Sequence, residues 1–255
     1  MCGNNGQEGL SRRALLSRAA IGAAATVSGV FQTTALAAPA PGTALTAPPT
    51  LTPEHVLAQL KQGNTAFLQG RPMAGDVRGR RRLEIARAQY PIAVLVSCSD
   101  SRVPPEVLFG KGLGELFIIR NAGNTIDTAA MGSLEYAVAE LNVPLIVVMG
   151  HERCGAVAAA VSVVEKGATF PGSIGRMVEP IVPAVLDAKR QGATDLLDAS
   201  VRLNVSRTVG RLREFSEPMV LERIKSGKLR VVGARYDLDD GRVDFFDEGS
   251  VNRST

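Results

Sequence analysis

Residues 94–102 read VLVSCSDSR and residues 146–155 read IVVMGHERCG, and these two stretches decide the fold. Each begins with a run of apolar, mostly β-branched residues, which is typical of a buried parallel strand. Each run ends at residues that bind metals: Cys98 follows the first run, and His151 and Cys154 follow the second. Ligands gather at the carboxyl ends of parallel strands, so two neighbouring strands would bring these three side chains together.

Two sulfurs and one imidazole nitrogen form a donor set that suits Zn²⁺. Three protein ligands leave a fourth tetrahedral position open, as in catalytic zinc sites. We therefore expect one zinc ion per chain at Cys98, His151 and Cys154. Cys154 also opens the next predicted helix, whose N-terminus favours a thiolate. The alternative for two cysteines in an oxidising compartment is a disulfide.

Asp100 and Arg102 follow the first cysteine closely enough for their side chains to pair. A carboxylate beside a zinc site can accept a hydrogen bond from zinc-bound hydroxide and orient it. Asp100 is therefore the candidate catalytic acceptor, and Arg102 is the residue expected to keep it ionised and turned from the metal. The alternative is an ion pair with a structural role alone.

Together the stretches CSDSR at 98–102 and HERC at 151–154 resemble the signatures of the β-class carbonic anhydrases, Cys-x-Asp-x-Arg and His-x-x-Cys. The resemblance covers roughly residues 51–247 and includes four further segments, PPE at 104–106, GELF at 114–117, RNAGN at 120–124 and YAV at 136–138.

This resemblance implies a zinc enzyme that reversibly hydrates carbon dioxide to bicarbonate and a proton through zinc-bound hydroxide. In some members of the class the aspartate becomes a fourth zinc ligand in a closed state, a role that would fall to Asp100. The resemblance also implies a homodimer or homotetramer whose active sites are lined by both subunits. The helix expected at Thr52–Gln69 would be the arm across that interface.

Two other functions fit the same residues. One is a hydrolase of carbon disulfide or carbonyl sulfide on the same zinc scaffold, and the other is a non-catalytic zinc-binding or redox protein. The segment RNAGN could be only a turn that ends a strand. Glu152 and Arg153 are expected to be exposed spacers, and His55 is expected to be a surface residue rather than a ligand.

The remaining pattern predicts a single α/β domain with a mainly parallel central sheet flanked by helices. About four parallel strands are expected, at 92–97, 115–120, 145–150 and 229–236, with an antiparallel edge strand at 242–246 after the turn at 239–241. Helices are expected at 52–69, 81–89, 127–141, 154–166, 172–191 (interrupted by two prolines) and 195–215.

The first 50 residues read as a targeting segment and a linker. Ser11, Arg12 and Arg13 begin a twin-arginine pattern, an Ala/Gly-rich stretch follows, and Ala35-Leu36-Ala37 fits a cleavage site. We expect a twin-arginine signal peptide at 1–37, a disordered Pro/Ala-rich segment at 38–50 and the enzyme domain at 51–255. The alternative for the first segment is a short amphipathic helix.

Composition limits the partners of the mature chain. Half of the net charge of +4 belongs to the expected leader, and the one dense basic run, at 78–82, has no interleaved aromatic residues, so we expect no nucleic-acid partner. No uninterrupted apolar run reaches the length of a membrane span, so we expect no stable membrane anchor. The partners expected are a small-molecule substrate (carbon dioxide or bicarbonate), further copies of the chain and, for the precursor, the twin-arginine export machinery. The mature protein would be periplasmic or otherwise exported.

Overall fold

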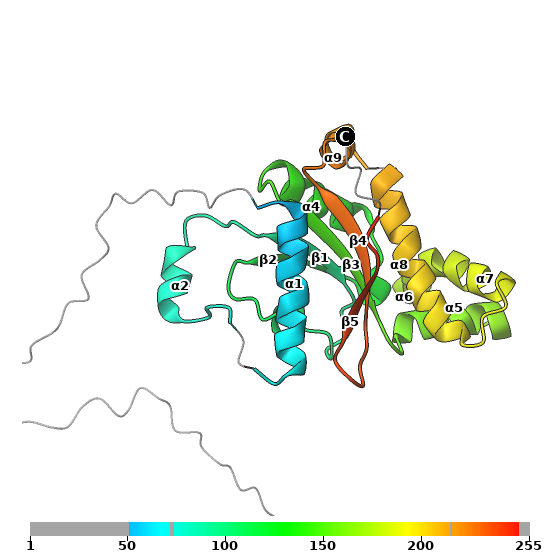
Figure 1. Ribbon diagram of the computed structural model, residues 1–255. Helices are drawn as coiled ribbons and strands as arrows, with labels where there is room; N and C mark the ends of the chain where they lie inside the picture. Colours follow the sequence, from blue (N-terminus) through cyan, green and yellow to red (C-terminus); the bar gives the residue numbers. More distant parts are fainter. Residues whose placement is uncertain (1–50, 72–73, 215, 250–255) are drawn as a thin grey trace, which may run out of the picture. The chain divides into compact units, whose positions relative to one another are not determined.

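The computed structural model describes residues 51–71, 74–214 and 216–249, and all of them belong to one compact unit of the chain. The expected leader, the Pro/Ala-rich segment and residues 250–255 lie outside the described residues. A single five-stranded sheet forms the centre of this unit (Figure 1). The strands are β1 (Ala93–Ser97), β2 (Leu116–Arg120), β3 (Leu145–His151), β4 (Arg230–Tyr236) and β5 (Val243–Asp247).

The sheet has the order β2-β1-β3-β4-β5, with four parallel strands and an antiparallel edge strand, as predicted. Every residue of β1 and β3 is buried, which is why both strands read as continuous apolar runs. Alternate residues of each strand point into different core clusters, so the sheet has two covered faces.

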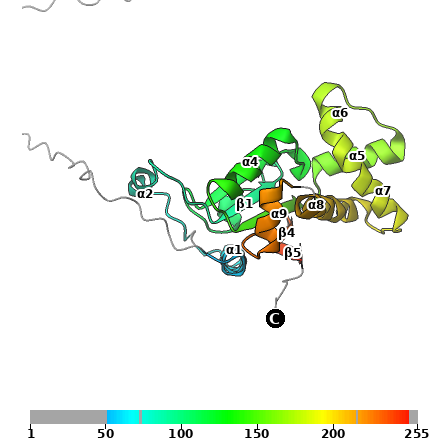
Figure 2. The same ribbon diagram turned by 90° about the horizontal axis from the view of Figure 1, so that it is seen from above.

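Helices lie on both faces of the sheet, as Figure 2 shows from above. One face packs against α1 (Pro53–Leu68) and α3 (Pro105–Leu108). The other packs against α4 (Thr128–Ala139), α8 (Leu196–Glu214) and α9 (Pro218–Lys225). A third cluster joins α5 (Gly155–Lys166) to α6 (Gly172–Val178) and α7 (Val182–Arg190), beside the carboxyl end of β3.

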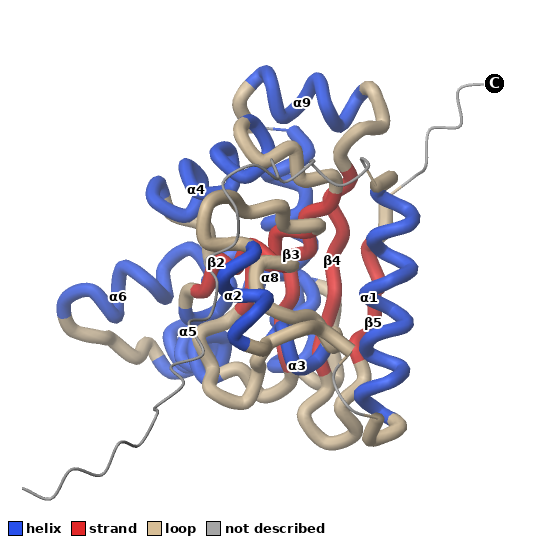
Figure 3. The backbone as a smooth tube through the Cα atoms, turned by 90° about the vertical axis from the view of Figure 1, so that its left-hand side faces the viewer, coloured by secondary structure: helices blue, strands red, loops and turns tan. Residues whose placement is uncertain are grey.

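The helix α1 begins where the sequence indicates. Thr52 caps it by accepting a hydrogen bond from the backbone N–H of His55 at 3.2 Å, and Pro53 occupies its first turn. Its apolar stripe, which includes Val56 and Leu60, is buried against the chain's own sheet. Figure 3 shows α1 alongside β5 at one edge of the sheet.

The bounds of one helix and the presence of two others differ from the expectation. The helix α2 covers Gly79–Glu84 rather than 81–89, because none of its residues is buried and no packing extends it. The short helices α3 and α9 were not predicted. The segment 172–191 is interrupted as expected: it divides into α6, a 3₁₀ turn (η2, Glu179–Ile181) and α7, since prolines at 180 and 183 interrupt the hydrogen-bond ladder.

The chain reverses between β4 and β5 at the predicted turn, where Gly241 has a φ of +80°. A side chain there would press on Phe67 of α1, so the turn needs glycine for two reasons. In the described part of the chain, no helix has the length and apolar character that a membrane crossing requires.

Candidate metal centre

Cys98, His151 and Cys154 converge at the carboxyl edge of the sheet. Cys98 is the first residue after β1, and His151 is the last residue of β3, which pairs with β1 directly. Cys154 is the N-cap of α5, as predicted. The three ligand atoms all lie within 4.8 Å of one another, and the residues are 4%, 0% and 1% exposed.

One ring nitrogen of His151 forms a hydrogen bond with the backbone, and the other has no hydrogen-bond partner among the described residues. Its Nδ1 lies 2.9 Å from the backbone carbonyl oxygen of Glu152. A carbonyl can only accept, so Nδ1 carries the proton and Nε2 keeps its lone pair. That Nε2 is buried and has no hydrogen-bond partner among the described residues, a costly arrangement unless a cation or a donor completes it.

The two sulfurs lie 4.0 Å apart and both cysteines are free, so the structure holds no disulfide between them. The contact with Cys154 lowers the pKa of Cys98, and so, more weakly, do His151 and the Gly123 N–H at 3.3 Å, while burial opposes them. The same shared bond and burial raise the pKa of Cys154, against the pull of the N–H groups at the start of α5. The two opposite shifts favour a thiolate at Cys98 over one at Cys154, and a bound divalent cation would stabilise both.

The donor set therefore fits a zinc ion. Two sulfurs and one imidazole nitrogen are ligands that Zn²⁺ prefers. The Nε2 of His151, which has no hydrogen-bond partner among the described residues, faces the sulfurs. The Nδ1 of the same ring bonds to a backbone carbonyl, as the non-ligating nitrogen does in most metal-binding histidines.

Asp100 lies beside this cluster and is paired with Arg102. The guanidinium donates to both carboxylate oxygens, at 2.9 and 2.8 Å, and the backbone N–H of Arg102 adds a third bond at 3.0 Å. These bonds hold the pKa of Asp100 well below its usual range. Its Oδ2 lies 3.8 Å from the Nε2 of His151, so the carboxylate borders the open side of the ligand cluster.

The segment 120–124 is more than a turn that ends a strand. Arg120 donates to the backbone carbonyls of Cys98 and Asp100, at 2.9 and 2.6 Å, and holds the loop that carries both residues. The N–H of Gly123 reaches the Cys98 sulfur, while Asn204 of α8 donates to the Gly123 carbonyl at 2.9 Å. Gly123 has a φ of +73°, in the left-handed region that favours glycine, so this residue type suits the turn that makes the contact.

Of Glu152 and Arg153, which were both expected to be exposed spacers, only Arg153 is exposed. Arg153 is exposed, but Glu152 is largely buried, with 19% of its side chain accessible. Glu152 is also tied to the β4–β5 hairpin by a hydrogen bond from the backbone N–H of Leu238. His55 is exposed on α1, as expected.

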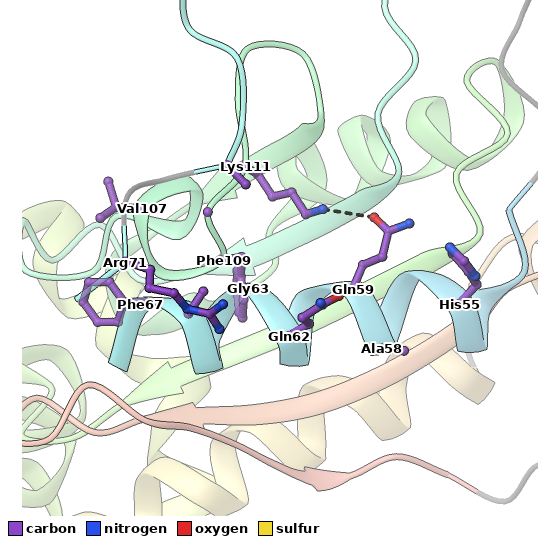
Figure 4. Close-up of a pocket in the computed structure, with 13 residues that line it drawn as sticks. His55, Ala58, Gln59, Gln62, Gly63, Phe67, Arg71, Val107, Phe109 and Lys111 are labelled. Carbon is purple, nitrogen blue, oxygen red and sulfur yellow. Dashed lines mark hydrogen bonds between the residues drawn. The ribbon is translucent and has the colours of Figure 1, made fainter. Parts of the chain in front are cut away.

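A cavity of about 790 Å³ lies away from the metal ligands, between α1 and the segment Val107–Lys111. Its lining includes His55, Phe67 and Phe109, and Lys111 crosses it to donate to Gln59 at 3.0 Å (Figure 4). None of the three ligands lines it, so this cavity is not the substrate site that the cluster defines.

Comparison with known proteins agrees with the geometry. The carbonic anhydrase family model matches residues 93–243, a span that contains the three ligands and both members of the Asp100–Arg102 pair. The chain belongs to the carbonic anhydrase family. Carbonic anhydrase 2 of Mycobacterium tuberculosis is 44% identical over 76% of this chain and 93% of its own length. Carbonic anhydrase of Mycolicibacterium smegmatis is 39% identical over 77% of this chain and 94% of its own length.

Solved structures identify the class. A tetrameric β-carbonic anhydrase of Sordaria macrospora aligns with a TM-score of 0.60 at 26% identity, covering 68% of this chain and 92% of the other. A β-carbonic anhydrase of Coccomyxa, solved in complex with acetazolamide, aligns with a TM-score of 0.56 at 30% identity, covering 64% and 75%. This carbonic anhydrase is of the β class, and it catalyses the hydration of carbon dioxide.

Proposed function

We propose that this enzyme hydrates carbon dioxide reversibly, to bicarbonate and a proton, at one zinc ion held by Cys98, His151 and Cys154. The observation that carries the proposal is the buried cluster of these three ligand atoms, in which the Nε2 of His151 has no other partner among the described residues. Bound there, zinc would lower the pKa of its water ligand to about 7 and so supply a nucleophile at neutral pH.

We assign the catalytic roles beside the metal to Asp100 and Arg102. Because Arg102 keeps the pKa of Asp100 low, the carboxylate is ionised at neutral pH and can only accept hydrogen bonds. Arg102 donates two hydrogen bonds to Oδ1 and one to Oδ2, so Oδ2 keeps a further lone pair. Asp100 can thus orient a proton-bearing nucleophile on the open side of the cluster, and Arg102 fixes the direction of that acceptor. Moving from Arg102 to the metal would make Asp100 a fourth ligand and close the site.

The surroundings suit a small, uncharged substrate. Cys98 and Cys154 belong to an apolar cluster with Val157 and Ile181, which suits an uncharged molecule such as carbon dioxide. The relatives reported above are all named carbonic anhydrase, and this favours hydration of carbon dioxide over hydrolysis of carbon disulfide or carbonyl sulfide. It also disfavours a non-catalytic zinc-binding role.

We further propose that the chain is exported as a folded precursor and is cleaved after Ala37. The paired arginines at 12 and 13 and the Ala35-Leu36-Ala37 site support this proposal. The mature enzyme would then act in the periplasm or outside the cell. Zinc loaded in the reducing cytoplasm would keep both thiolates from forming a disulfide during export.

We propose that the mature enzyme is a homodimer or homotetramer. The solved relative from Sordaria macrospora is described as tetrameric. In this chain, β2 is an edge strand whose Leu116, Phe117 and Ile118 are only half-buried. The apolar stripe of α1 packs on the chain's own sheet, so an arm across an interface would have to use the outward face of that helix.

The proposed function is tested by stopped-flow measurement of carbon dioxide hydration on mature protein whose metal content is known. We expect one zinc per chain and rapid hydration. Cys98→Ser and His151→Ala should lose both zinc and activity. Full zinc occupancy in either variant would refute the ligand assignment, and a zinc-loaded parent protein without hydration activity would support the non-catalytic alternative.

A further inference from the structure

The orientation of His151 depends on a single peptide carbonyl. Its Nδ1 bonds to the carbonyl oxygen of Glu152 at 2.9 Å, and its Nε2 has no partner among the described residues. If that carbonyl turned away, no other acceptor shown would hold the proton on Nδ1, whereas Asp100 Oδ2 lies 3.8 Å from Nε2. Whatever holds the Glu152 peptide in place therefore also holds the histidine in its ligating form.

The side chain of Glu152 is clamped by the β4–β5 hairpin. One carboxylate oxygen accepts a hydrogen bond from the backbone N–H of Leu238 at 3.2 Å. The other lies 3.0 Å from Arg153 and 3.8 Å from Arg235, whose side chain is only 11% exposed. The backbone N–H of Glu152 donates to the carbonyl of Tyr236 at 2.9 Å. Backbone and side chain are thus tied to the same hairpin.

Arg153, the next residue, has a strained backbone conformation, so the bend at 152–153 needs support from its surroundings. Arg153 has a φ of +49°, in the left-handed region that residues other than glycine rarely adopt. Its guanidinium forms two bonds to Asp239, at 2.9 and 2.6 Å, in the turn of the hairpin. The hairpin therefore stabilises the bend that points the Glu152 carbonyl at His151 and brings Cys154 to the cluster.

The carboxylates around Glu152 form ion pairs with arginines. Glu152, Asp237 and Asp239 have oxygens within 4.8 Å of one another. Arg235 bonds to Asp237 at 3.0 Å, and Arg153 bonds to Asp239, so the negative charges are compensated by ion pairs. The group acts as a clamp between the hairpin and the metal ligands.

We propose that Glu152 is a positioning residue, whose carboxylate holds the carbonyl that fixes His151 as the Nδ1–H tautomer before a metal binds. The proposal rests on the proposed function, since it gives His151 the role of a zinc ligand. Glu152→Met keeps much of the side-chain volume but has only a weakly accepting thioether, whereas Glu152→Gln keeps an oxygen for the Leu238 N–H.

The first measurement is zinc affinity, by competition between the zinc-loaded protein and a chromogenic chelator. Loss of the clamp in Glu152→Met or Glu152→Ala should weaken binding by about tenfold to a hundredfold, the usual effect of removing an outer partner of a ligand. Glu152→Gln should stay near the parent. Glu165→Ala is the matched control. Glu165 on α5 also forms an ion pair, but its partner is Lys189 of α7 rather than a residue of the hairpin.

The second measurement is imidazole ¹⁵N NMR on protein freed of zinc under reducing conditions. The chain has two histidines, and the exposed His55 serves as the internal reference for mixed tautomers. We expect the Nδ1–H form alone for His151 in the parent and in Glu152→Gln, and a mixture in Glu152→Met. A Glu152→Met protein with parental zinc affinity and an unmixed tautomer would overturn the inference. A parent protein that binds no zinc would instead refute the proposed function.

Discussion

The substitution Gly123→Ala tests how closely the metal centre is packed. Gly123 has a φ of +73°, where an alanine is disfavoured by roughly 1–2 kcal/mol. An added Cβ would also lie 2.6 Å from the Cδ1 of Ile181 and 3.1 Å from the Cβ of Ala156. Overpacking of a core site typically costs about 1–3 kcal/mol. We therefore expect Gly123→Ala to reduce the free energy of unfolding by about 2–5 kcal/mol.

The control for the backbone contribution is Gly167→Ala, at the end of α5. Gly167 has a φ of +62°, but no atom lies within 4 Å of the position of an added Cβ. Urea unfolding of this variant should show only the conformational part, about 1–2 kcal/mol. Adding Ile181→Val to Gly123→Ala removes the clashing methyl group, so the double variant should lose less than the sum of the single losses. Equal losses for Gly123→Ala and Gly167→Ala would refute the packing argument.

Three further predictions concern catalysis, export and acid stability. Asp100→Asn should keep zinc but slow hydration by about 100-fold. Arg102→Ala should also slow hydration, while it changes the free energy of unfolding by no more than about 1 kcal/mol. An Asp100→Asn enzyme as fast as the parent would exclude a catalytic carboxylate. Changing residues 12–13 to lysine should leave the precursor in the cytoplasm, which fractionation would detect, and normal export would contradict the twin-arginine proposal. Arg235 lowers the pKa of Asp237 below its value of about 3.9 in the unfolded chain, so the stabilisation is present above pH 4 and is lost as the pH falls further. Urea unfolding of Asp237→Asn should therefore show a weaker decline between pH 5 and 3, and an unchanged decline would contradict this assignment.

Most of the sheet could be predicted because burial and sequence pattern agree there. β1 and β3 are buried at every position, and such strands need apolar, β-branched residues throughout. The unpredicted helices α3 and α9 are short, and each has a proline in its first turn, which in sequence reads equally as a turn. Their existence depends on packing, because neither is long enough to be stable alone.

The cluster could be predicted because its ligands occupy strand ends, whereas its support could not. Gly123 acts through a backbone N–H and Glu152 through a backbone carbonyl, and every residue type carries those groups. Asn204 is 81 residues from the glycine whose carbonyl it holds. Glu152 was expected to be exposed because a charged residue between two ligands has no apolar pattern around it, and the β4–β5 hairpin that covers it comes from a distant part of the sequence.

The order of the strands explains why the centre forms at this edge. β1 lies between β2 and β3, so the chain leaves β1 toward one neighbour and later returns to its other side. This reversal leaves room at the carboxyl ends of the strands, where binding sites occur in open α/β sheets. Each of the three strands is followed by one contact to the site: Cys98 after β1, the Gly123 N–H after β2, and His151 at the end of β3. The register pairs Ser97 with both Arg120 and Met149, so the three strands end close to one another. A slip of one residue would turn every side chain of a strand to the opposite face, so the same apolar packing that stabilises the sheet also fixes the geometry of the metal ligands.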